Sequence, residues 1–291
     1  MPDETDGHWY DALPRPQWSK LERVPQSQDW FDVYRVTVDV FAIYEPGHFE
    51  EVISYLIPGN ERAALIDTGM GIGDMKQLTS ELTDLEVFVL NSHTHFDHVG
   101  GNHQFGVIYA MDTDISRERS LGMPPSEAFE YVAEEDVFSR ATPPGFERGQ
   151  YEIKPFKITH IIEDGETIDL GDRLLEIINT PGHAPDEICV FDEANRLLFT
   201  ADAFYPAHMY VHLPGSDFDT YAASAARMAA LADRVDHLLP AHNYTPVDAS
   251  ALTRLDAAFQ AIRAGTAQWI PHEDGTRKYL FEDFYLILPG E

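Results

Sequence analysis

The segment 91–103 reads NSHTHFDHVGGNH and holds four of the thirteen histidines of the chain, together with Asp97. An apolar stretch, VFVL at 87–90, predicts a short buried strand before it, and the following Gly-Gly pair suggests a bend into a helix. His93 and His95 therefore face the same way on an extended segment, while Asp97 and His98 follow where the chain turns. Imidazole and carboxylate groups are the expected ligands of Zn²⁺, and two such clusters side by side make a two-metal site. A solvated, histidine-rich loop is the alternative, but four ligand-type residues in the pattern HxHxDH favour metal binding.

Three more residues of ligand type follow apolar, strand-like segments elsewhere in the chain. They are His183 after 174–180, Asp202 after 196–200 and His242 after 235–239. Each one alone is more typical of a capping or surface residue than of a ligand. An α/β architecture gathers its chemistry at strand ends, so the recurrence of all three at such ends predicts that they complete the set.

These motifs together resemble the metallo-β-lactamase superfamily. They are HxHxDH at 93–98, TPGH at 180–183, the aspartate after LLFTA at 202, PAH at 240–242 and LIDTG at 65–69. Their order and approximate spacing agree with the family from about residue 33 to residue 243. The resemblance implies an α/β fold, the four-layer αβ/βα sandwich, with the metal site along one edge between the two sheets.

The resemblance also implies a role for each ligand. His93, His95 and His183 would hold one metal ion, Asp97, His98 and His242 the other, and Asp202 would bridge both. Two Zn²⁺ ions are the implied cofactors, with iron or manganese as alternatives. Asp67 would fix the local loop and one ligand imidazole. Ala201 and Ala184 depart from the usual Gly and Thr or Ser, and neither departure removes a ligand.

Two metal ions lower the pKa of bound water, so they make a nucleophile available near neutral pH for attack on an ester-type carbonyl. Asp97 or Asp202 would then move the proton towards the leaving group. This predicts hydrolysis without a covalent intermediate. The lone Cys189 is not needed, and we expect it to be a small buried apolar residue.

The leaving group is less well defined by the sequence. Tyr205 lies three residues after Asp202, as in lactonases of this superfamily that cleave acyl-homoserine lactones, where a tyrosine hydroxyl contacts the substrate carbonyl. Packing beside the site is the alternative role for Tyr205. We therefore predict a lactone or carboxylic ester as the small-molecule substrate. A glyoxalase II-like thioesterase and a β-lactamase are alternatives, although nothing clearly matches the basic residues with which glyoxalase II binds glutathione.

An alternative of another class is a persulfide dioxygenase, which resembles this pattern but uses a single iron ion. A non-catalytic binding protein on the same fold would lack metal ligands, and none is missing from the pattern. Among the other histidines, His103 is predicted to lie on a helix outside the site, while His208 and His212 are candidates for the pocket wall.

Charge is the unusual global feature of this chain. Fifty acidic residues face 20 basic ones, of which five are lysines, and the formal net charge is −30. Such a field repels phosphate backbones and anionic membranes, so we expect no nucleic-acid or membrane partner. Adaptation to high salt is favoured over an ordinary acidic protein. No apolar run reaches the roughly 18 residues of a transmembrane helix, and MPDETDGHWY lacks the features of a signal peptide, which predicts a cytoplasmic protein.

The chain divides into an N-terminal arm, 1–30, and a single domain, 31–291. The arm carries three tryptophans and is expected to dock on the main body or on a second subunit of a homodimer. Within the domain, an acidic helical insertion at about 112–150 could cover the active-site mouth or be a surface excursion. The hydrophobic pattern predicts single strands at 33–43 and 277–288 and helices at 74–83, 217–233 and 248–264.

Overall fold

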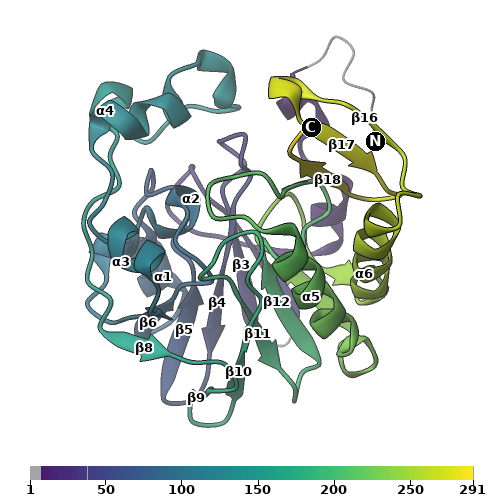
Figure 1. Cartoon of the computed structure of the whole chain (residues 1–291). Coiled ribbons are helices and arrows are strands. Elements are labelled where there is room, and N and C mark those ends of the chain that lie inside the picture. The colour runs from purple at the N-terminus through teal and green to yellow at the C-terminus, as the bar shows by residue number, and fades with distance from the viewer. Residues whose placement is uncertain (1–7, 38, 291) are drawn as a thin grey trace. The chain divides into compact units, whose positions relative to one another are not determined.

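The computed structural model describes residues 8–37 and 39–290 (Figure 1). The first seven residues of the arm, Val38 and Glu291 lie outside the described residues. The chain forms two compact units. The first contains the described residues up to 162 and the segment Asp169–Arg173, and the second contains Glu163–Ile168 and the chain from Leu174 onward.

The first unit contains an eight-stranded sheet whose strands lie in the order in which they follow along the chain. They are β1 (Glu22–Val24), β2 (Asp32–Thr37), β3 (Val40–Tyr44), β4 (Ile53–Pro58), β5 (Arg62–Ile66), β6 (Glu86–Leu90), β7 (Ile108–Met111) and β8 (His160–Ile162). Neighbours are antiparallel from β1 to β5 and parallel from β5 to β8. All five residues of β3 are buried, as expected for a strand covered on both faces.

Short helices accompany this sheet. The α-helices are α1 (Met75–Leu82), α2 (Phe96–Val99), α3 (Asp114–Arg119) and α4 (Pro125–Ala128), and the 3₁₀ helices are η1 (Trp9–Ala12), η2 (Pro16–Lys20), η3 (Asn102–Gln104), η4 (Phe129–Val132), η5 (Glu135–Val137) and η6 (Arg148–Gln150). The side chain of Asp74 caps α1 by accepting a hydrogen bond from Gln77 N at 2.9 Å. The segment predicted as an insertion at about 112–150 contains α3, α4 and η4 to η6.

The arm packs against the sheet of its own unit. Trp18 is 2% exposed and stacks on Tyr34 and Tyr44, with ring centroids 4.6 and 4.5 Å apart. Arg15 donates through its Nε to Glu51 Oε1 at 2.8 Å. Aromatic burial and a paired guanidinium thus fix the arm on β2 and β3, one of the two docking surfaces that the sequence suggested.

The second unit contains two sheets. The six-stranded sheet has the order β15 (Val247–Asp248), β14 (His237–Pro240), β12 (Leu197–Ala201), β11 (Ile188–Asp192), β10 (Leu174–Asn179), β9 (Thr167–Asp169). The four-stranded sheet has the order β13 (His208–Tyr210), β18 (Tyr285–Leu288), β17 (Arg277–Leu280), β16 (Trp269–Pro271). In the larger sheet, β12 pairs antiparallel with β11 and parallel with β14.

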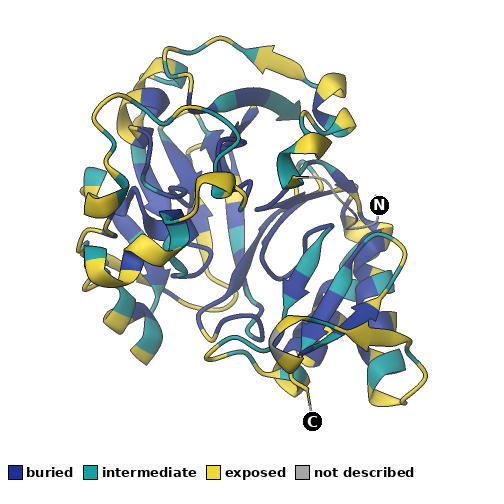
Figure 2. Ribbon diagram, turned by 90° about the horizontal axis from the view of Figure 1, so that it is seen from above, coloured by how far each residue is buried: buried dark blue, intermediate teal, exposed yellow. Residues whose placement is uncertain are grey.

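Helices α5 (Phe218–Ala229) and α6 (Ser250–Arg263) lie side by side in this unit (Figure 1), together with the 3₁₀ helices η7 (Ala232–Arg234) and η8 (Glu273–Gly275). Tyr221, Ala222, Ala225 and Met228 recur at helical spacing on α5 and are buried in the core of this unit. In Figure 2 the central strands are mostly buried, whereas many helices have an exposed face. Among residues 8–37 and 39–290, no helix has the length and apolar character to cross a membrane.

The two long strands predicted at 33–43 and 277–288 are wrong in length. Each is an antiparallel hairpin, β2–β3 and β17–β18. The first turns at Asp39, whose φ is +52°, a conformation that aspartate tolerates better than most residues. Both arms of each hairpin have a strand-like composition, so a period-two pattern alone does not reveal the turn between them.

Candidate metal centre

The predicted ligand segment lies where β6 ends and α2 begins. Residues 91–95 run from the end of β6 to His95, which precedes the first residue of α2. The turn after α2 packs tightly on the loop that follows β5: Gly100 N donates to Gly69 O at 2.9 Å. A Cβ at Gly71, whose φ is +72°, would lie 2.4 Å from Gly100 O, so only glycine fits there. Close backbone packing therefore holds the ligand segment in place.

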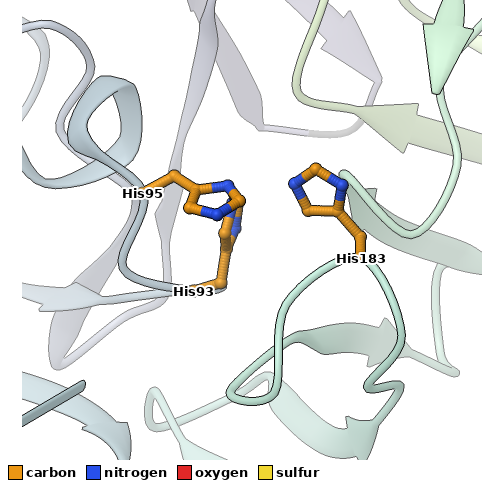
Figure 3. Close-up of side chains that lie close together, drawn as sticks. All are labelled: His93, His95 and His183. Carbon is orange, nitrogen blue, oxygen red and sulfur yellow. The ribbon is translucent and has the colours of Figure 1, made fainter. Parts of the chain in front are cut away.

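His93 and His95 direct ring nitrogens at each other. His93 Nε2 and His95 Nδ1 are 3.0 Å apart, and Figure 3 shows the two imidazoles together on the segment that leads to α2. Two nitrogen ligands about 2.0–2.1 Å from one tetrahedral ion would be about 3.3 Å apart. This pair therefore has the spacing of two ligands on one metal ion.

Asp97 and His98 form a second pair. His98 Nε2 lies 3.5 Å from Asp97 Oδ2, and both side chains are buried. The other ring nitrogen, His98 Nδ1, lies 2.8 Å from Asp67 Oδ2. A proton on Nδ1 donated to that carboxylate leaves Nε2 as the lone-pair donor, which is the tautomer that a metal ligand needs.

Asp67 is itself fixed by Ser92, the residue before the first predicted ligand. Its Oδ1 accepts from Ser92 N at 2.8 Å, and its Oδ2 accepts from Ser92 Oγ at 2.6 Å. Asp67 directly follows β5 and has a φ of +60°, so the backbone itself turns this carboxylate towards the segment. Asp67 thus contacts both the local loop and one ligand imidazole, the two groups that the sequence analysis expected it to fix.

His183, Asp202 and His242 come together in the second unit. His183 Nε2 lies 3.4 Å from Asp202 Oδ2, and His242 Nε2 lies 3.0 Å from Asp202 Oδ1. His183 Nδ1 is 3.1 Å from Tyr210 O, an acceptor that fixes a proton on Nδ1 and leaves Nε2 to face the carboxylate. Figure 3 shows the His183 ring at the turn of its own loop. Each oxygen of Asp202 thus faces a different imidazole, as in a carboxylate that bridges two ions.

The backbone of Asp202 is held as firmly as its side chain. Tyr221 Oη donates to Asp202 O at 2.8 Å, and Asp202 N donates to Glu187 Oε1 at 3.2 Å. The residue before His183 must also be glycine, because a Cβ on Gly182 would lie 2.3 Å from Tyr221 Cα. The first unit presents four ligand residues in two pairs, and the second presents three, with two histidines on Asp202. Such clusters could hold metal ions.

Tyr205 lies beside this second set. Its ring centroid is 4.8 Å from that of His242, and the side chain is 5% exposed. Its hydroxyl donates a hydrogen bond to His208 O, a backbone acceptor three residues further on. The hydroxyl therefore has a structural partner, and the catalytic contact that the sequence analysis assigned to Tyr205 stays a prediction.

The other singled-out residues have structural partners of their own. His208 packs on the Tyr285 ring at 5.0 Å, and His212 Nδ1 is 3.3 Å from Ile287 O. His103 lies on η3, with Nδ1 3.2 Å from Gly100 O. Cys189 is fully buried, which raises the pKa of its thiol to about 12 and confirms it as a small apolar residue rather than a nucleophile.

Glu45 supports the ligand region and is absent from the sequence prediction. It is 1% exposed and accepts hydrogen bonds from Trp30 Nε1 at 2.6 Å and from Met70 N at 3.0 Å. Burial raises the pKa of this carboxyl to about 7. One feature of the sequence could have pointed to Glu45: it directly follows the five apolar residues of β3, and a charged residue is unusual beside a buried strand.

Comparison with known proteins places these observations in a family context. The model of the Metallo-beta-lactamase superfamily matches residues 50–242, which include all seven predicted ligands. The human acyl-coenzyme A thioesterase MBLAC2 is 30% identical over 229 residues, covering 73% of this chain and 79% of the relative. The thioesterase pkgB of Emericella nidulans is 28% identical, covering 74% of this chain and 53% of the relative.

Solved structures agree on the fold. The MIM-2 metallo-β-lactamase matches with a TM-score of 0.56 and 19% identity, covering 80% of this chain and 89% of that protein. At this identity the likeness concerns the fold alone. It confirms the predicted α/β class and the metallo-β-lactamase fold.

Proposed function

The chain belongs to the metallo-β-lactamase superfamily, and from this premise we propose that it is a metal-dependent hydrolase of acyl thioesters. Two relatives, each matching nearly three-quarters of this chain, are named thioesterases. The name of one of them specifies acyl-coenzyme A as its substrate. Thioesters were the alternative to lactones and carboxylic esters in the sequence analysis. The relatives favour that alternative, while the HxHxDH chemistry serves all three acyl classes.

The proposed metal ligands are the seven residues of the sequence analysis. His93, His95 and His183 would hold one ion, Asp97, His98 and His242 the other, and Asp202 would bridge them. The observation that carries this assignment is Asp202, whose two oxygens face different histidines at 3.4 and 3.0 Å. Imidazole and carboxylate without thiolate suit Zn²⁺, with iron or manganese as alternatives.

Two bound ions would supply an activated water molecule and stabilise negative charge on the acyl oxygen. The residues of the chain would do the remaining work. Asp67 holds the proton of His98 on Nδ1, and Tyr210 O does the same for His183, so that both rings keep Nε2 for the ions. Asp97 or Asp202 would accept the proton of the attacking water.

The leaving group of a thioester suits this site. A thiol has a pKa near 8.5, so it departs as a thiolate with less need of a proton donor than an alkoxide. The pKa of the buried Cys189 is raised to about 12, which argues against a covalent acyl-enzyme through its sulfur. Direct attack by water is therefore the proposed route.

The test combines elemental analysis of the purified protein with hydrolysis rates on four model substrates: an acyl-CoA, a lactone, a β-lactam and an aryl phosphate ester. We expect about two zinc ions per chain and the highest kcat/KM on the thioester. Asp202→Asn should lower kcat/KM by at least 100-fold and reduce the metal content, because an amide bridges two cations poorly. Asp236→Asn, an exposed aspartate on the same unit, is the matched control and should change neither quantity.

Other outcomes would overturn the proposal in different ways. A lactone hydrolysed faster than the thioester would restore the ester or lactone as the substrate class. One iron ion per chain without hydrolysis of any substrate would instead place the protein with the mono-iron oxygenases.

A further inference from the structure

A pocket of about 100 Å³ lies directly beside the predicted metal ligand His95, wholly within the first unit. One wall is the ligand segment itself, through Thr94, His95, Phe96 and Val99. The opposite wall comes from the region after β7. It consists of Arg119, Gly122, Met123, Tyr131 and Ile153. Most of these groups are apolar or aromatic, in a protein with a net charge of −30.

Both walls of this pocket are held by specific contacts. Met123 and Ile153 form an antiparallel bridge with two backbone hydrogen bonds of 2.8 and 3.0 Å. The Tyr131 ring stacks on the Phe96 ring, with centroids 3.6 Å apart. His48 Nε2 lies 2.9 Å from Tyr131 O and ties this segment to the loop before β4. The pocket is thus formed before any ligand arrives, which reduces the ordering cost of binding.

Gly122 allows the two segments of the wall after β7 to pack closely against each other. Its φ is +83°, and a Cβ at this position would lie 2.3 Å from Ile153 O. Any larger residue would push the Met123–Ile153 bridge apart. The side chains of Met123 and Ile153 therefore reach the pocket from a fixed backbone.

The size of the pocket limits what it can hold. An apolar cavity of about 150 Å³ accommodates benzene, with its six carbons. By that measure a volume of about 100 Å³ accommodates roughly four carbons. A short acyl chain fits this description, while a long chain would have to leave the pocket.

We propose that this pocket binds the acyl group of the substrate and that Met123 limits the chain length to about four carbons. The inference rests on the proposed thioesterase function. It gives the region after β7 a role in specificity, because the acyl tail lies against Met123 while the carbonyl lies at the predicted metal ligands. Each methylene in a hydrophobic pocket changes kcat/KM by roughly 10- to 200-fold, so a fixed wall selects chain length sharply.

The experiment compares acetyl-, butyryl-, hexanoyl- and palmitoyl-CoA as substrates of the full-length protein. We expect kcat/KM to be highest for butyryl-CoA. Met123→Ala should raise the hexanoyl-to-butyryl ratio of kcat/KM at least tenfold, and Met123→Phe should shift the preference to acetyl-CoA. Leu121→Ala is the matched control on the same segment, because Leu121 is 73% exposed and does not line the pocket.

A second measurement does not depend on turnover. Titration calorimetry with S-butyl-CoA and S-hexyl-CoA, two thioethers that cannot be hydrolysed, should show a matching rise in the hexyl-to-butyl ratio of binding constants in Met123→Ala. Palmitoyl-CoA as the best substrate of the wild-type protein, or unchanged ratios in both Met123 variants, would overturn the inference and leave the thioesterase proposal standing. If no thioester is hydrolysed, the proposed function fails, and the calorimetric ratios still decide whether the pocket binds alkyl chains.

Discussion

Glu45 lies in an environment that disfavours the charged form of its carboxyl. Its carboxyl is buried between Trp30 Nε1 and Met70 N, two donors that satisfy one oxygen each. Burial has the larger effect and raises the pKa from 4.5 to about 7. Through Met70, this side chain supports the loop that follows Asp67, so its protonation state affects the stability of the region that presents the predicted ligands.

Glu45 should make the protein less stable as the pH rises. The folded state holds this proton more tightly than the unfolded state, so the contribution is fully present below about pH 4.5 and is lost as the pH rises towards 7. Between pH 5 and pH 8 we expect the free energy of unfolding to fall by about 2–3 kcal/mol on this account. The contribution of Glu45 is measured by urea unfolding of the wild type and of Glu45→Gln at both pH values. A difference between the two proteins that does not change with pH would contradict the assignment.

The arm packs on the sheet of the first unit through buried aromatic and charged contacts. Trp18 on η2 is enclosed by Tyr34 on β2 and Tyr44 on β3, and Arg15 binds Glu51 just before β4. The family model begins at residue 50, so the arm lies outside the matched region. Its contacts nonetheless belong to the core of the unit rather than to a frayed end.

Removal of the Trp18 side chain should cost as much as a mutation in the core. We expect Trp18→Ala to lower the free energy of unfolding by about 3–5 kcal/mol, because a large buried aromatic is lost and a cavity remains. Trp269→Ala provides the control, since Trp269 is 45% exposed and its loss should cost less than about 1 kcal/mol. Urea unfolding followed by circular dichroism measures both. A loss for Trp18→Ala as small as that expected for Trp269→Ala would mean that Trp18 adds little to the stability of the sheet.

At the scale of the whole molecule, a net charge of −30 opposes folding through repulsion between carboxylates. At least ten arginines among the described residues have ion pairs with carboxylates, from Arg15–Glu51 to Arg263–Asp219. Fifty acidic residues against 20 basic ones still leave most carboxylates without a cation of their own. This imbalance is the basis of the predicted adaptation to high salt.

Salt should therefore stabilise the protein. Raising KCl from 20 mM to 500 mM shortens the screening length severalfold, and we expect Tm at pH 7.5 to rise by about 2–4 °C, equivalent to roughly 1 kcal/mol. The same titration at pH 5, near the sequence pI of about 4.5, should give a smaller rise because fewer carboxylates are charged. Calorimetry at both pH values measures the effect. A Tm that falls with added KCl at pH 7.5 would exclude the repulsion argument.

The sequence by itself determined the class of fold, and it predicted which residues do the chemistry. HxHxDH and the three ligands at strand ends are patterns of residue type. The hydrophobic periods of strands and helices can likewise be read from short stretches of sequence. The sequence also indicated the arm, through its tryptophans. It failed at the two hairpins, because a turn such as that at Asp39 leaves little trace between two strand-like segments.

Only the tertiary structure decided which atom faces which. No local pattern specifies that Asp202 turns one oxygen to His183 and the other to His242, because these residues come from three segments up to 59 positions apart. The same is true of Glu45 beneath the loop after Asp67, of the Tyr205 hydroxyl on a backbone carbonyl, and of the wall that Met123 and Ile153 form beside His95. Residue types and periods are local properties of a chain. Burial, pKa and ligand geometry arise from contacts between distant segments, and these exist only once the chain has packed.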